Sequence, residues 1–150
     1  MRDLILVSAC LCGVPCRYDG GTCVNLQAVS LVAAGRALPV CPEALGGLST
    51  PRMPAELQGE SDDVLRGKAL VINKEGVDVT SAYVAGAKET LAVCKEWGIT
   101  RAYMKTRSPS CGCGILYDGT FTSTLKEGWG VTAYLLKENG VSVCPMDSND

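Results

Sequence analysis

The chain has 150 residues, of which 47% are hydrophobic and 20% are charged, and its formal net charge is −2. This size and composition fit one globular domain with a single core, and the longest apolar runs are too short to cross a bilayer. The sequence has no block of lysine and arginine that would bind a nucleic-acid backbone, so we expect a small molecule as the partner.

The first half of the chain predicts two strands, a helix and a long loop. Residues 3–9 form a short apolar run typical of a buried strand, and residues 24–36 have helical spacing with Asn25 as a candidate N-cap. A second strand is expected at 37–41. Residues 42–67 contain several glycines and prolines without a clean period, and we expect one long loop there.

The second half alternates strands and helices, which predicts the α/β class. The expected elements are a hairpin within 68–80, the longest helix at 80–97, a strand at 100–106, a small hairpin at 115–123, a helix at 130–140 and a strand at 141–145. We therefore expect a single domain over residues 1–150, with a mostly parallel, Rossmann-like sheet flanked by helices and small β-hairpins.

The start of the chain does not fit a signal peptide. Only residues 4–7 are strongly apolar, and Asp3 interrupts the basic start that such a leader needs. We expect a cytoplasmic protein.

Nine cysteines and the absence of histidine narrow the possible chemistry. Without histidine, zinc sites with His ligands and Ser-His-Asp or Cys-His catalysis are excluded. In a chain without an export signal, thiols more often bind metal or do chemistry than form disulfides. Thiolate ligands select zinc, Cu(I) or iron–sulfur clusters.

Three cysteines follow predicted strands at separate points of the chain. Cys10 follows the first strand, Cys41 ends the second, and Cys111 lies in the loop after the strand at 100–106. Ligands of open α/β sheets bind beyond the carboxyl ends of the strands, so we expect these thiols to meet at one edge. The other cysteines are predicted to be alternative ligands or a separate zinc site (Cys12, Cys16, Cys23, Cys113) or core residues (Cys94, Cys144).

Three polar residues are further candidates, each with a structural alternative. Glu43, two residues after Cys41, suits a general acid or base, or it is a surface glutamate. Ser108 in "SPSC" is a turn former or a donor to substrate. Arg52, between two prolines, suits a planar or anionic ligand, or it pairs with Glu56.

Seven motifs occur in order: "SACLCG" at 8–13, "RYDGG" at 17–21, "CPEALGG" at 41–47, "TPRMPAE" at 50–56, "GVDVT" at 76–80, "KTRSPSCG" at 105–112 and "YDGTF" at 117–121. With these motifs, nearly the whole chain resembles the thiouracil desulfidase (thiouracil desulfurase) family. The resemblance implies a [4Fe-4S] cluster held by Cys10, Cys41 and Cys111 with one iron open. It also implies that Glu43 and Ser108 are the catalytic carboxylate and serine.

The reaction that the resemblance implies is a non-redox desulfuration. Sulfur leaves thiolated uracil, or a related thio-nucleobase or nucleotide, as sulfide, and the oxo product is formed. Thiouridine within RNA is an alternative substrate that the acidic chain argues against.

Two alternatives from other classes stay open. A non-catalytic zinc-binding or sulfur-carrier module would saturate its metal with four thiolates and leave no open site. A thiol redox protein is also conceivable, although the chain has two Cys-x-Cys motifs and no Cys-x-x-Cys motif.

Overall fold

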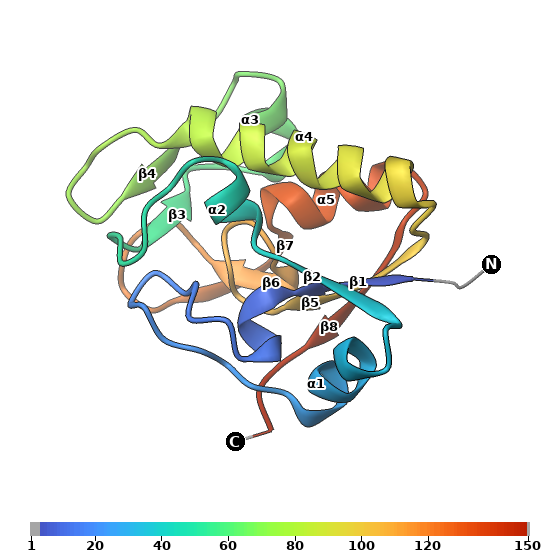
Figure 1. Cartoon of the computed structure of the whole chain (residues 1–150). Helices are drawn as coiled ribbons and strands as arrows, with labels where there is room; N and C mark the ends of the chain where they lie inside the picture. Colours follow the sequence, from blue (N-terminus) through green and yellow to red (C-terminus); the bar gives the residue numbers. More distant parts are fainter. Residues whose placement is uncertain (1–3, 150) are drawn as a thin grey trace.

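A parallel four-stranded sheet forms the centre of the protein, which a computed structural model describes for residues 4–149 (Figure 1). The strand order is β2-β1-β5-β8, with bounds Ala37–Val40, Ile5–Ser8, Arg101–Lys105 and Ser142–Met146. All three neighbouring pairs are parallel. The α/β class is confirmed, and the four strands fall where the sequence predicts them, apart from the first residue of 3–9, which lies outside the described residues.

Helices cover both faces of this sheet. Helix α1 (Leu26–Ala33) lies on one face, and α4 (Thr80–Trp97) and α5 (Val131–Glu138) lie on the other (Figure 1). Asn25 caps α1 as predicted, because its Oδ1 accepts a hydrogen bond from the Ala28 N–H at 3.1 Å. Helix α4 ends at Gly98, whose φ of 65° is left-handed and favours glycine.

The segment 42–67 is not one loop, so that prediction is wrong. It contains helix α2 (Pro42–Leu45), strand β3 (Ala55–Leu57) and helix α3 (Ser61–Leu65). These elements are too short to show a period, and Pro42 lies in the first turn of α2, where its missing N–H costs nothing.

Both predicted hairpins pair differently from expectation. Strand β4 (Val71–Asn73) pairs antiparallel with β3, and the residues after its turn add only the single bridge Ile72↔Asp78. The second hairpin joins β6 (Cys113–Tyr117) to β7 (Leu125–Trp129), so it is longer than 115–123. The partner of β4 thus precedes it in the chain, across helix α3, and the partner of β6 follows a loop longer than the predicted turn.

The core lies on both faces of the sheet. Leu6 and Met104 of the sheet pack against Cys94, which lies on the buried side of α4 and is 2% exposed, as expected for a core thiol. Cys144 is exposed, so its prediction as a core residue is wrong; it lies on β8, an edge strand of the sheet.

Two glycines allow helix α2 to touch helix α4. A Cβ atom at Gly86 would overlap the carbonyl oxygen of Pro42, and one at Gly46 would overlap that of Ala82. We expect Gly86→Ala to lower the free energy of unfolding by about 1–3 kcal/mol through overpacking, as measured by urea denaturation.

Whether Gly86→Ala lowers or raises the free energy of unfolding tests this explanation. Helix propensity alone predicts the reverse, because alanine in a helix interior is more favourable than glycine by about 1 kcal/mol. A more stable Gly86→Ala variant would show that the two helices do not need this close contact.

Within residues 4–149, no helix combines the length and the apolar character needed to cross a membrane.

Candidate functional site

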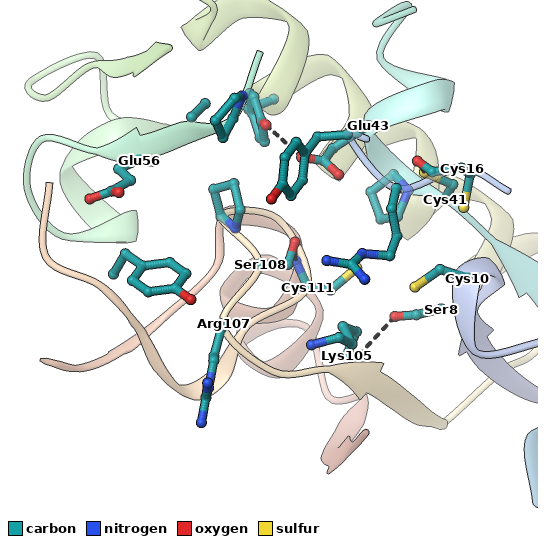
Figure 2. A pocket seen from close by; sticks show the side chains of 18 of the residues that line it. Ser8, Cys10, Cys16, Cys41, Glu43, Glu56, Lys105, Arg107, Ser108 and Cys111 are labelled. Carbon is teal, nitrogen blue, oxygen red and sulfur yellow. Dashed lines mark hydrogen bonds between the residues drawn. The ribbon is translucent and has the colours of Figure 1, made fainter. Parts of the chain in front are cut away.

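A cavity of about 440 Å³ lies at the carboxyl ends of β1, β2 and β5 (Figure 2). Cys10 reaches it from the short 3₁₀ helix η1 (Ala9–Cys12), Cys41 from the N-cap position of α2, and Cys111 from the loop after β5. Glu43 and Ser108 line the same cavity. The structure therefore brings all five predicted site residues together, although they lie far apart in the sequence.

Two of the three predicted ligands are buried, and Cys41 is partly buried. Cys10 is 8% exposed and Cys111 is 5% exposed. Burial raises the pKa of Cys111 to about 12, against hydrogen bonds from Ser8 and Ser110 that lower it. The pKa of Cys41 is also raised, first by a hydrogen bond with Cys16 and then by burial. Without a metal these two thiols are protonated at neutral pH, so binding a metal as thiolates releases protons.

Ser108 holds the turn that carries Cys111. Its Oγ accepts hydrogen bonds from the N–H groups of Ser110 at 3.1 Å and of Cys111 at 3.0 Å. Both lone pairs of the oxygen are used in this way, and the hydroxyl proton is left to reach Ser110 Oγ at 3.0 Å or a bound molecule.

The same turn caps helix α5. The N–H group of Val131 donates to the Pro109 carbonyl and that of Thr132 to the Ser110 carbonyl, each at 2.9 Å. No side chain caps this helix, so the loop with Cys111 supplies the missing partners for its first turn.

Glu43 is held by two buried partners. Arg52 Nη2 donates to Glu43 Oε2 at 2.7 Å, and the Tyr83 hydroxyl donates to Oε1 at 2.5 Å. The side chains of Arg52 and Glu43 are 6% and 15% exposed. Burial and the nearby carboxylate raise the pKa of Tyr83, which therefore stays a neutral donor.

The pairing of Arg52 with Glu56, one alternative from the sequence, is wrong. Glu56 Oε1 instead accepts the Gly119 N–H at 2.9 Å. Tyr83 was missed, because its position on the buried side of α4 reads as ordinary core in the sequence.

We expect Arg52→Met to lower the free energy of unfolding by about 3–5 kcal/mol, because it leaves the buried Glu43 carboxylate without its cation. Denaturant titration measures this change. The double variant Arg52→Met/Glu43→Gln should recover part of the loss, since the unpaired charge is gone. Additive losses in the double variant would mean that the two side chains are not coupled.

Besides the thiols, the cavity is lined by aromatic and basic residues. Three non-glycine residues among 4–149 have positive φ, namely Arg107 at 69°, Phe121 at 58° and Ser123 at 60°, and all three line the cavity. Such strained backbone concentrates at functional sites. The aromatic lining residues are Tyr18, Tyr83, Tyr117 and Phe121, and the basic ones are Arg17, Lys74, Lys105 and Arg107.

Within residues 4–149, no three Cys, Asp or Glu side chains gather closely enough to hold a single metal ion. A lone zinc ion needs all its ligands at one point, whereas the thiolates of an iron–sulfur cluster each bind a different iron. The three soft thiols that line the cavity are a donor set that suits an iron–sulfur cluster.

Fold and site together define an α/β protein with a thiol-lined cavity at the carboxyl edge of its sheet, next to a paired carboxylate. Sequence comparison agrees with this class: the family model described as 2-thiouracil desulfurase matches residues 5–148. The chain belongs to the 2-thiouracil desulfurase family.

Two similar proteins support this membership. "Uncharacterized protein YbbK" of Bacillus subtilis (strain 168) is 47% identical over 141 residues, which is 93% of each chain. A solved structure of the "[4Fe-4S]-dependent thiouracil desulfidase TudS" superimposes with a TM-score of 0.86 at 43% identity, covering 96% of this chain and 91% of that one.

Proposed function

We propose that this chain is a [4Fe-4S]-dependent desulfidase that removes sulfur from thiolated uracil or a related thio-nucleobase or nucleotide. One observation carries the proposal: Cys10, Cys41 and Cys111, from the ends of three adjacent strands, line one cavity with the paired carboxylate of Glu43. The printed name of the similar solved structure supports the same cofactor and substrate class. The whole chain would then be one desulfidase domain.

Three thiolates, those of Cys10, Cys41 and Cys111, would hold the cluster and leave one iron without a protein ligand. When bound, a cluster of this kind supplies a soft Lewis acid that polarises a thiocarbonyl bond. A thiocarbonyl and water give a carbonyl and hydrogen sulfide, so the atoms balance without an electron donor or acceptor.

In this proposal Glu43 is the general base that takes a proton from the attacking water. Arg52 and Tyr83 fix both of its oxygens, at 2.7 and 2.5 Å, so the carboxylate faces the cavity in one orientation. A fixed carboxylate within reach of water meets the first requirement for such catalysis, which is geometry.

Ser108 has two roles in this proposal. Its oxygen holds the turn with Cys111, and its hydroxyl proton is available to a polar atom of the substrate ring. Tyr117 and Phe121, which also line the cavity, supply aromatic faces for a flat heterocycle.

The proposed compartment is the cytoplasm. All nine cysteines are free thiols, the form that reducing compartments maintain. The proposed substrate is a small molecule rather than a long RNA, because the chain carries a net charge of −2.

Anaerobic reconstitution with iron and sulfide tests the proposal. We expect broad visible absorbance, iron and sulfide bound to the protein, and conversion of 2-thiouracil to uracil with release of sulfide. A colourless protein that binds zinc and no iron would favour the zinc-binding or sulfur-carrier alternative instead.

A further inference from the structure

A fourth thiol, that of Cys16, faces the same cavity as the three proposed cluster ligands. Cys16 lies between η1 and α1, is 8% exposed and lines the cavity with Cys10, Cys41 and Cys111. In Figure 2 its side chain lies next to that of Cys41, on the side of the cavity where Cys10 also lies. The five remaining cysteines, all within the described residues, lie outside the lining (Cys12, Cys23, Cys94, Cys113, Cys144).

The Cys16 side chain packs with two of the proposed ligands. Cys10 and Cys16 are buried members of one hydrophobic cluster, and Cys41 packs against it. The Cys41 sulfur also lies 3.9 Å from the Cys16 carbonyl oxygen. Cys16 therefore lies in the same wall of the cavity as two of the residues that would hold the cluster.

The backbone around Cys16 is fastened to the site. Arg52 Nη2, which binds Glu43, also donates to the Cys16 carbonyl at 3.0 Å. The backbone N–H of Arg52 donates to the Tyr18 carbonyl at 2.7 Å. One buried arginine therefore positions the carboxylate and the fourth thiol together. Preorganisation of this kind is typical of a residue that binds a ligand rather than one that merely fills space.

We propose that Cys16 is a displaceable fourth ligand of the cluster in the substrate-free protein. This inference rests on the proposed function, and it concerns the iron that Cys10, Cys41 and Cys111 leave open. Four thiolates are the usual complement of a [4Fe-4S] cluster, and a soft substrate sulfur competes for iron with a soft thiolate. On displacement, Cys16 gives up its bond to iron, keeps both electrons and takes up a proton, so no group is oxidised or reduced.

Mild oxidation of the reconstituted protein tests this role without measuring turnover. A cluster with an unprotected iron loses that iron to become a three-iron cluster, which has its own EPR signal. We expect Cys16→Ala to form the three-iron cluster under anaerobic ferricyanide at least about tenfold faster than the unchanged protein, the scale on which ligand-sphere changes act. Cys23→Ala, from the same segment but outside the cavity, should behave like the unchanged protein.

Each result of this experiment decides between alternatives. Equal rates for Cys16→Ala and the unchanged protein would overturn the role of Cys16 while leaving the proposed function intact. Cys16→Ala and Cys16→Val, which fills more of the space, could both fail to load a cluster although circular dichroism shows that they are folded. Cys16 would then be an obligatory ligand, and its proposed role as a displaceable one would be wrong. If the unchanged protein loads no cluster, the proposed function itself fails.

Discussion

Replacing Cys41 with alanine is expected to abolish both cluster binding and desulfidase activity. Cys41 lies at the junction of β2 and α2, and its side chain contacts Cys16 and lines the cavity. Without it, one of the three proposed ligands is missing from a site that no histidine can complete. After anaerobic reconstitution, visible absorbance, bound iron and uracil formation measure the loss.

Cys94→Ala is the matched control for this prediction. Cys94 is also a buried thiol, at 2% exposure, but it lies on the core-facing side of α4 and does not line the cavity. Its truncation should cost about 1 kcal/mol of stability and leave the cluster and the activity in place. The ligand assignment would be wrong if Cys94→Ala lost the cluster and Cys41→Ala kept it.

The second large effect is expected for Glu43→Gln. Glutamine keeps the shape of the side chain and one accepting oxygen, but it cannot take a proton from water and leaves the buried Arg52 guanidinium without its counter-charge. We expect kcat to fall by about 10²–10⁴-fold, the usual contribution of a general base, with bound iron unchanged. Steady-state conversion of 2-thiouracil, normalised to iron content, measures this change.

Glu89→Gln is a suitable control for the same chemistry. Glu89 is an exposed carboxylate on α4, outside the cavity lining, so its amide should leave kcat unchanged. If Glu43→Gln retained full activity per iron, the base would have to be another group or water alone.

The sequence was sufficient to predict the meeting of three distant cysteines. Each follows a strand, and parallel strands bring their carboxyl ends to one edge. The strands and the longer helices were predicted for the same reason: each has a hydrophobic pattern of adequate length and a clear end, such as Asn25 before α1 or Gly98 after α4.

The remaining features depend on contacts that no local pattern encodes. Glu43 reaches Tyr83, forty residues away, because α2 packs on α4 at two glycines, and it also pairs with Arg52 from the segment before β3. The short elements within 42–67 are stabilised by their neighbours rather than by their own propensity, so composition alone suggested a loop. The contacts of Cys16 arise in the same way.

The main-chain cap of helix α5 has one more consequence. The peptide carbonyls of Pro109 and Ser110 bind the N–H groups of Val131 and Thr132, so fraying of that helix and loss of the Cys111 turn are a single event. The rate of deuterium uptake at the Val131 and Thr132 amides would then measure how often the turn that carries Cys111 opens. Slower uptake in the iron-loaded protein would give the free energy by which the bound cofactor stabilises this turn.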